Sequence, residues 1–369
     1  MDSAKPSLDL VRSLTDQHVL HALMQHRRLT RAELATMIGI SKPTAGESVR
    51  RLTERGLVTD TGERTPGGRG KGRVGFYYAL APTVGAALAV TIAPAGVVAE
   101  CVNIYGEPGV RVTRQIDRPA LPARVSAALE DAVAEVRETA GQDFRVAVVG
   151  AADPVDRATG RLVQLPDAPF LVGSLDPVAV LAPYVDGPVV VDNDVNWAAL
   201  AERDGAGAQV LRDFAYMYLG EGLGCAIVND GEVRRGHTGL AGEVAHLLTL
   251  GPGGRAVRFI ELFGKLGLRR NGSTAIDVDR LLASPAATHE VLATAVGGVV
   301  AAVIALADPQ AVLVGGPWGP AVVDNMRAAT ANMPRHVPIR AAEVTGEPVL
   351  AGVRAEALSR LRAEVTADG

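Results

Sequence analysis

The sequence has few cysteines and no long, uninterrupted apolar run. Two cysteines, Cys101 and Cys225, are too few for a disulfide framework and are typical of a reducing cytoplasm. No apolar run reaches the ~18 residues that cross a bilayer. The N-terminus, MDSAKPSLDLVRSL, lacks the basic-then-apolar pattern of an export signal. These absences exclude a disulfide-rich secreted scaffold and predict a cytoplasmic protein with no membrane partner.

Length and charge indicate more than one domain. A chain of 369 residues predicts two or three domains. Residues 1–80 carry 13 Lys+Arg and 8 Asp+Glu, whereas the remaining residues carry 24 and 33, so the first segment is +5 and the rest −9. A basic segment ahead of an acidic body is expected where one domain contacts a polyanion. The alternative is that the basic residues cluster there by chance.

The first forty residues contain start and stop signals for two helices. Residues 12–26 space their apolar side chains along one helical face. Thr30 and Glu33 have the spacing of a capping box for a second helix, 31–38, which stops at Gly39. The side chains expected to face inward are Leu14, Val19, Leu20, Leu23, Met24, Leu34, Met37 and Ile38.

A third, more polar helix follows after a tight turn. Ser41 is its expected N-cap, Pro43 lies in its first turn, and Gly56 ends it. The expected inward face is Ala45, Val49 and Leu52, and the expected outward face is Pro43, Thr44, Glu47, Arg50 and Arg51. Two short helices with a basic, exposed second member predict a helix-turn-helix.

A basic hairpin completes this segment. Residues 57–61 and 75–81 are predicted strands, and the connection between them is rich in glycine and arginine. Residues 1–80 are therefore predicted to form a winged helix-turn-helix domain that binds double-stranded DNA. The residues expected near DNA are Ser41, Lys42, Pro43, Thr44, Glu47, Arg50, Arg51, Arg64, Arg69, Lys71 and Arg73. The alternative is a three-helix interaction module whose arginines face solvent.

Residues 81–369 alternate apolar, strand-like runs with helical patterns, which predicts an α/β body. Two similar strand-turn-strand units that start near residues 85 and 213 indicate an internal duplication. Strands are expected at 84–92, 96–106, 144–151, 187–193, 214–220 and 311–316, and helices at 123–140, 196–204, 256–268, 277–306 and 349–365.

Four blocks of the body resemble the ROK family of repressors and sugar kinases: PVDRATGRLVQLPDAPF, VDNDVNWAALAE, YMYLGEGLGCAIVNDGEVRRGHTGLAGEVAH and DPQAVLVGG. The resemblance implies a two-lobed, actin-like (ribonuclease H-like) sugar-kinase fold with a ligand cleft between the lobes. Family members that carry an N-terminal winged helix are generally sugar-responsive repressors.

The resemblance also implies which residues contact a sugar. The matching positions are Asn193, Asp194, Glu243, His246 and Glu261. Carboxylates and amides suit sugar hydroxyls, which both donate and accept hydrogen bonds. Asp194 matches the general base of the family's kinases and is catalytic only if this chain is a kinase. Alternatively, Asp194 and Asn196 only cap the helix that begins near Trp197.

The sequence departs from the family's kinases at the nucleotide site. Thr91 and Ala93 stand where the family has an aspartate and a glycine that serve magnesium and phosphate. Glu221 replaces a threonine of the second phosphate loop, where its charge is expected to repel ATP. The glycine pair at 315–316 remains. The sequence therefore predicts that kinase activity is lost and that the protein is not an enzyme.

The sequence also lacks the family's zinc ligands. Pro252, Gly254 and Phe259 stand at the positions of the family's cysteines, and Phe259 is expected to fill the space by packing. No metal and no cofactor are therefore expected.

Together these patterns predict a sugar-responsive transcriptional regulator, acting as a repressor, that binds an inverted-repeat operator as a homodimer or a dimer of dimers. Two alternatives remain at this point. One is an active ATP-dependent sugar kinase with an accessory DNA-binding domain. The other is a DNA-binding protein whose effector pocket has decayed and whose body serves only dimerisation.

Overall fold

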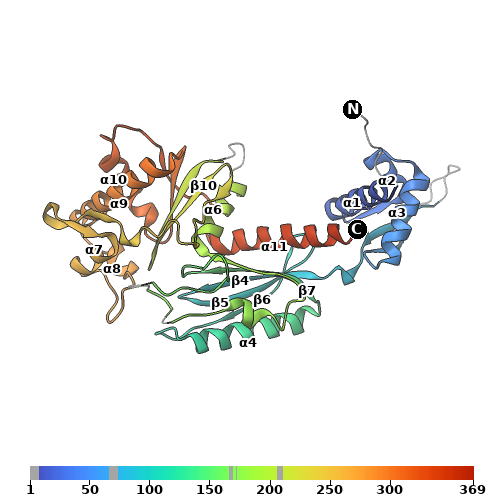
Figure 1. Ribbon diagram of the computed structural model, residues 1–369, viewed down its shortest axis with the longest axis horizontal. Helices are drawn as coiled ribbons and strands as arrows, with labels where there is room; N and C mark the ends of the chain where they lie inside the picture. The colour runs from blue at the N-terminus through green and yellow to red at the C-terminus, as the bar shows by residue number, and fades with distance from the viewer. Residues whose placement is uncertain (1–7, 66–73, 166–168, 172, 206–210) are drawn as a thin grey trace.

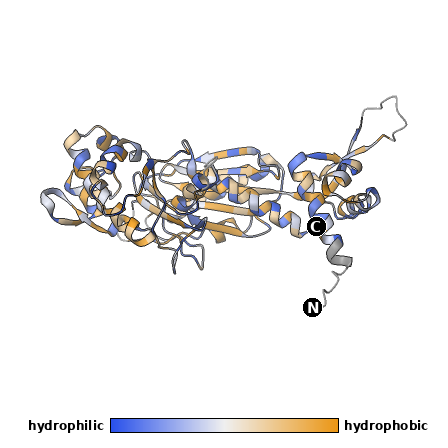
Figure 2. Ribbon diagram, turned by 90° about the horizontal axis from the view of Figure 1, so that it is seen from above, coloured by the Kyte–Doolittle hydropathy of each residue, from blue (hydrophilic) through white to orange (hydrophobic). Residues whose placement is uncertain are grey.

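The computed structural model describes residues 8–65, 74–165, 169–171, 173–205 and 211–369. Figure 1 shows an elongated molecule with the N-terminal helices at one end and a two-part α/β body extending away from them. The strands in the middle of the body are mainly hydrophobic (Figure 2). The C-terminus lies beside the N-terminal domain in both views.

The N-terminal domain is a winged helix. Its elements are the helices α1 (Leu8–His26), α2 (Arg31–Ile38) and α3 (Lys42–Glu54), and a sheet of order β1-β3-β2 made of β1 (Arg28–Thr30), β2 (Val58–Arg64) and β3 (Phe76–Leu80). The predicted caps are present. The Glu33 amide donates to Thr30 Oγ1 over 3.2 Å, Glu33 accepts from the Thr30 amide, and the Thr44 amide donates to Ser41 Oγ over 3.2 Å.

Two predictions for this domain are wrong, and one of its strands was not predicted. Leu14 and Met37 are 46% and 47% exposed, because the domain is too small to cover every apolar side chain of its helices. Arg51 does not face outward: it contacts the buried Asp16 of α1, with 2.6 Å between Arg51 Nη2 and Asp16 Oδ1. The strand β1 was not predicted, because three residues carry too little pattern to indicate a strand.

The first lobe of the body is a five-stranded sheet of order β6-β5-β4-β7-β8. Its strands are β4 (Ala86–Ala93), β5 (Gly96–Val102), β6 (Pro108–Arg114), β7 (Phe144–Ala151) and β8 (Val189–Asn193), after a short 3-10 turn, η1 (Pro82–Val84). Helix α4 (Pro122–Ala140) covers one face, and α5 (Pro177–Leu181) packs beside it. Helix α6 (Asp194–Gly205) leaves this sheet at the end of β8.

The second lobe repeats the same plan with the order β11-β10-β9-β14-β15. Its strands are β9 (Phe214–Leu219), β10 (Leu223–Asn229), β11 (Glu232–Val233), β14 (Ala311–Gly315) and β15 (Ile339–Ala341). Its helices are α7 (Phe259–Lys265), α8 (Val278–Leu282), α9 (Ala286–Ala307), α10 (Gly319–Thr330) and α11 (Pro348–Ala367). The matching strand orders agree with the predicted internal duplication.

Helices α6 and α11 lie between the two sheets, and each packs on the sheet of the other lobe. Helix α11, which follows β15, contacts β4 and β7, while α6, which follows β8, contacts β9 and β10. The two helices cross closely at Gly352, where an added Cβ would lie 2.0 Å from the Trp197 carbonyl oxygen. A continuous apolar core runs from this layer into the winged helix.

Two of the predicted helices differ from the structure. The helix expected over 277–306 is broken into α8 and α9, because Pro285 begins the second helix as its N-cap residue. The helix expected over 256–268 begins only at Phe259, since 256–258 form the strand β13 (Ala256–Arg258), which pairs with β12 (Leu248–Leu250).

Although no uninterrupted apolar run reaches ~18 residues, one described helix is long and apolar enough to cross a membrane by length and composition. This helix is α9, and 50% of its most apolar window is buried inside the protein. It contacts α10 and β12 as a core helix of a globular protein does.

Candidate functional site

The N-terminal end of α3 is exposed and polar. Ser41, Lys42, Pro43 and Thr44 are all exposed, whereas Ala45, Val49 and Leu52 are fully buried, so the predicted inner face is confirmed. Lys42 has no salt bridge within the described part of the chain. The free cation at the start of an exposed helix is suited to contact a phosphate or a base edge.

Three other candidate residues of α3 are occupied by ion pairs. Arg50 lies 2.9 Å from Glu47 and 2.7 Å from Glu54, so the charges of Arg50 and Glu47 largely cancel. These contacts lower the pKa of Glu47 and raise that of Arg50. Arg51 is held by Asp16, as described above.

The basic residues of the wing are only partly described. Arg64 belongs to β2 rather than to the connection, and its guanidinium lies 5.0 Å from the centre of the Phe76 ring. Arg69, Lys71 and Arg73 lie outside the described residues. Arg31, which was not among the candidates, is exposed on α2 and lies over the Tyr78 ring.

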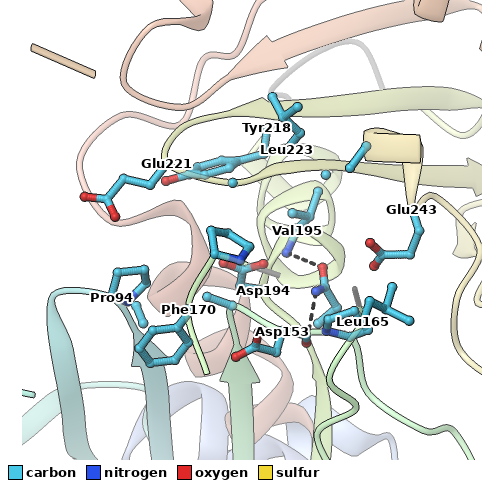
Figure 3. A pocket seen from close by; sticks show the side chains of 18 of the residues that line it. Pro94, Asp153, Leu165, Phe170, Asp194, Val195, Tyr218, Glu221, Leu223 and Glu243 are labelled. Atoms are coloured by element: carbon cyan, nitrogen blue, oxygen red, sulfur yellow. Dashed lines mark hydrogen bonds between the residues drawn. The ribbon is translucent and has the colours of Figure 1, made fainter. Parts of the chain in front are cut away.

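A cavity of about 370 Å3 lies between the two lobes and has the size of a small-molecule site. Its wall is formed by the ends of β4, β7, β8 and β9 and by the segment before η2 (Val244–His246) (Figure 3). Most of the lining is apolar. The residues that bring polar groups are Asp153, Asn193, Asp194, Tyr218, Glu221, Glu243 and His246.

Three carboxyl groups in this cavity have strongly raised pKa values. Burial raises the pKa of Asp153, Asp194 and Glu243 to about 7 in each case. The charge of Asp153 raises the pKa of both neighbours further. These groups are poised to change protonation near neutral pH when a ligand binds.

Asn193 fixes the geometry of this wall. Its Oδ1 accepts from the Val195 amide over 3.0 Å at the start of α6, and its Nδ2 donates to the Asp153 carbonyl oxygen over 3.2 Å. Asn196 donates to Asp192 instead of capping the helix. The Asp194 side chain lines the cavity.

Glu243 reaches the cavity because of the glycine before it. Gly242 has φ +94°, and an added Cβ would lie 1.7 Å from the Cys225 carbonyl oxygen. A side chain at that position would push the segment away from β10. His246 also lines the cavity, whereas Glu261 is not among its lining residues and lies 3.8 Å from Arg258.

The Glu221 carboxylate is neutralised, which weakens the expectation that it repels phosphates. Glu221 lies 2.6 Å from Arg118 of the first lobe and 2.9 Å from Arg270 of the second. The three side chains form an ion-pair bridge at the edge of the cavity. The bridge ties the segment between β6 and α4 to the turn between β9 and β10.

The glycine pair at the end of β14, Gly315 and Gly316, has structural roles. An added Cβ at Gly315 would lie 2.1 Å from the Tyr216 hydroxyl, and Gly316 has φ +86°. Trp318, which is fully buried, donates from its indole nitrogen to the Gly220 carbonyl oxygen over 2.9 Å. These close contacts explain both glycines without a nucleotide.

Phe259, which stands at a position of the family's cysteines, packs in the core of the second lobe. It is fully buried, and its ring centre lies 5.7 Å from that of Phe263. The hairpin of β12 and β13 leads the chain back to α7.

Sequence reasoning missed Asp153, Tyr218 and Phe170 as cavity residues. Asp153 follows the apolar strand β7 within two residues, and an acidic residue directly after a buried strand was the available signal. Phe170 and Tyr218 gave no such signal, because aromatic side chains serve cores as often as sites.

Two family models match the chain. Residues 100–256 match the ROK family, and residues 12–59 match winged helix-turn-helix DNA-binding. The chain therefore carries a ROK family domain behind an N-terminal winged helix-turn-helix domain.

The relatives include both kinases and repressors. A glucokinase of Streptomyces coelicolor is 32% identical over 165 residues, which are 45% of this chain and 49% of the relative. A putative xylose repressor of a Caldicellulosiruptor species is 24% identical over 243 residues, 64% of this chain and 59% of the relative. The chain thus spans about half the length of these curated relatives.

A solved structure shares the fold over nearly the whole chain. It is a ROK family transcriptional regulator, a homolog of the E. coli MLC protein, with a TM-score of 0.64 and 17% identity, covering 97% of this chain and 100% of that one. The winged helix followed by the two-lobed, actin-like sugar-kinase body is therefore the fold of this protein.

Proposed function

We propose that this protein is a transcriptional regulator, acting as a repressor in the cytoplasm, whose DNA affinity responds to a sugar or sugar derivative. Residues 1–80 would bind double-stranded DNA, and residues 81–369 would bind the effector and a second copy of the chain. A dimer with two-fold symmetry would match an inverted-repeat operator. The similarity to regulators and to a putative xylose repressor supports this proposal.

The observation that carries the proposal is the path of α11. Val349, in its first turn, lines the cavity between the lobes. At its other end, Arg55 of the winged helix donates to the Gly369 carbonyl oxygen over 2.6 Å, and α11 contacts α1. One helix of 20 residues, about 30 Å long, thus joins the ligand cavity to the DNA-binding domain (Figure 1).

A ligand can use this connection only if it prefers one arrangement of the lobes. Closure of the cavity would move the start of α11, and the winged helix would follow at its other end. The difference in ligand affinity between the two arrangements would set the upper limit of the change in operator affinity, and bound DNA would change the ligand affinity by the same factor as the ligand changes the DNA affinity.

The test is binding of the purified protein to DNA from upstream of its own gene, at low salt, with and without xylose or glucose. Affinity should fall steeply as salt rises. Lys42→Ala should reduce the salt slope by about one, as for the loss of one phosphate contact. Absence of binding to any such fragment at low salt contradicts the proposal.

Two further variants separate the sites. Arg69→Ala combined with Lys71→Ala should weaken operator binding and leave sugar binding unchanged. Asp194→Ala should abolish the sugar response and retain DNA affinity. Equal loss of both properties in either variant would indicate misfolding or a wrong assignment of the site.

The second candidate is an ATP-dependent sugar kinase with an accessory DNA-binding domain. It is favoured by Asp194, which lines the cavity with a pKa of about 7, as suits a general base, and by the similarity to a glucokinase. Thr91 and Ala93 argue against it. An ADP-release assay over a panel of hexoses decides the matter, and sustained turnover would favour the kinase.

A further inference from the structure

The cavity between the lobes holds an aspartate that the described residues satisfy poorly. Asp153 is 1% exposed and lines the cavity, and neither of its carboxylate oxygens has a hydrogen bond of ordinary geometry within the described residues. The Leu171 amide lies near enough to lower the pKa of Asp153 slightly, but burial outweighs this contact. A buried polar group without a partner destabilises the folded protein, so its presence calls for an explanation. A ligand with donor groups would provide one.

Two more carboxylates surround the same space. Asp194 begins α6 and Glu243 precedes η2, so the three acidic groups come from three separate segments (Figure 3). The charge of Asp153 acts on both of the others. Together they make a region of strong negative potential once they are ionised.

The described cations near this region are already paired elsewhere. Arg235 lies 2.6 Å from Asp192, and Arg118 and Arg270 contact Glu221. None of these arginines lines the cavity, where the other titratable groups are His246, Tyr218 and Glu221. Residues 166–168 and 172, outside the described part, contain no lysine, arginine or histidine. A cationic ligand would supply the positive charge that the described lining lacks and would favour the ionised carboxylates.

An organic cation fits this arrangement better than a metal ion. Within the described residues, no three side chains of His, Cys, Asp or Glu are grouped closely enough to hold a metal. The acidic groups are instead spread over a cavity of about 370 Å3 whose remaining wall is largely apolar, with Pro94, Phe170 and Leu223. An ammonium group on a ring satisfies both features, because it donates three hydrogen bonds and leaves the ring faces to apolar contacts.

We propose that the cavity selects an amino sugar whose protonated amino group is held by Asp153 and is favoured further by the negative charges of Asp194 and Glu243. This inference rests on the proposed ligand-responsive function and names the chemical class of the effector. Charge-assisted hydrogen bonds to the ammonium would satisfy the Asp153 oxygens. His246 and the remaining carboxylate oxygens would take the ring hydroxyls.

The experiment is calorimetric titration of the full chain with glucosamine, galactosamine and mannosamine. The matched ligands are the corresponding hexoses and N-acetylhexosamines, which lack the positive charge. At least one hexosamine should bind about tenfold more tightly, or better, than both of its neutral counterparts. Binding of that hexosamine should strengthen as the pH rises through about 7, because the carboxyl groups ionise.

Variants of two neighbouring aspartates provide the control. Asp153→Asn should remove most of the preference for the amine. Asp156→Asn should keep it, because Asp156 lies outside the cavity and accepts hydrogen bonds from Ala158 and Thr159. Asp153→Asn should also raise the melting temperature of the unliganded protein, which shows that the variant folds.

The outcomes separate this inference from the function on which it rests. Equal or tighter binding of a neutral hexose overturns the amino-sugar inference while leaving the regulator intact. An unchanged amine preference in Asp153→Asn overturns it as well. If no sugar of either class binds or alters operator affinity, both the inference and the sugar-responsive function fail.

Discussion

At the residue scale, two adjacent arginines of α3 have opposite roles. Arg51 is 27% exposed and pairs with Asp16, whose buried carboxylate also accepts from Ser48. Arg50 is exposed and pairs with two glutamates of its own helix. The first contact holds α3 against α1, whereas the second lies on the surface.

Arg51→Met should therefore lower the free energy of unfolding of the winged helix by about 2–3 kcal/mol, because it leaves the Asp16 charge buried without its partner. The matched control, Arg50→Met, should change stability little, since solvent screens exposed pairs. Urea unfolding of both variants measures the difference. Similar losses in the two would contradict this assignment.

The three cavity carboxyl groups predict a pH dependence of stability. Their pKa values are raised to about 7 in the folded protein, while unfolded aspartate and glutamate titrate near about 4. The folded state thus binds more protons than the unfolded state between these pH values. The stabilisation that these three groups contribute is therefore fully present below about pH 4 and is lost as the pH rises to about 7.

Thermal unfolding of the ligand-free chain at pH values between about 5 and 8 measures this effect. The melting temperature should decline as the pH rises toward about 7 and then level off. Asp153→Asn should show a smaller decline because it removes one of the three groups. A melting temperature that climbs steadily over the same range would mean that these carboxyl groups do not have raised pKa values.

Local sequence predicted the residues whose partners are local. Thr30, Glu33 and Ser41 were placed as caps because their partners lie within three residues. The role of Arg51 was not predictable, since Asp16 is 35 residues away. Asp153 was missed for a similar reason, because its place in the cavity depends on Asp194 and Glu243, which are far from it in the sequence.

At the element scale, α11 contacts both the first-lobe sheet and α1. A buried ion pair between Glu100 of β5 and Arg354 anchors it to that sheet. Leu361 and Val365 are fully buried in the same core as Val19 and Leu20 of α1. The helix is thus well packed at both ends of its path.

Leu361→Ala should loosen this packing, at a loss of about 2–4 kcal/mol. We expect operator binding to persist and its response to the effector to weaken, because the winged helix no longer follows the start of α11. Leu306→Ala is the control, since Leu306 at the end of α9 is 85% exposed. Electrophoretic shift of operator DNA with and without effector measures the binding and the effector response of both variants. An intact effector response in Leu361→Ala would exclude α11 as the connection between the cavity and the winged helix.

Helices and strands with a strong hydrophobic periodicity were predicted from the sequence. Short strands that depend on pairing with another strand were not. The expected strands 144–151 and 187–193 overlap β7 and β8, and 349–365 overlaps α11. The short strands β1, β11, β13 and β15 have two or three residues and exist because another strand offers hydrogen bonds, a neighbouring strand for β11 and β13 and a more distant one for β1 and β15. Such strands have too few residues to show a pattern.

At the scale of the whole molecule, the bridge from Arg118 to Glu221 joins the lobes. Arg118→Met should let the lobes open more often, and exchange of amide hydrogens in the β9–β10 turn should rise roughly two- to fivefold, as for an exposed pair. Arg124→Met is the control, because Arg124 pairs with Asp117 of its own lobe. Unchanged exchange in Arg118→Met would show that the bridge does not hold the cavity closed.

The order of domains and the fold class followed from the sequence, and the relative placement of the parts did not. The winged helix was predictable from its caps and turn, and the body from the ROK motifs. The position of α6 and α11 between the sheets depends on close approach at Gly352, which pattern alone does not reveal.

The exchange of α6 and α11 between the lobes makes each half of the body depend on the other. A single lobe, separated from the other lobe, would expose the sheet face that the other lobe's last helix covers. The interlocked helices therefore favour a body that unfolds as one cooperative unit rather than as two independent halves.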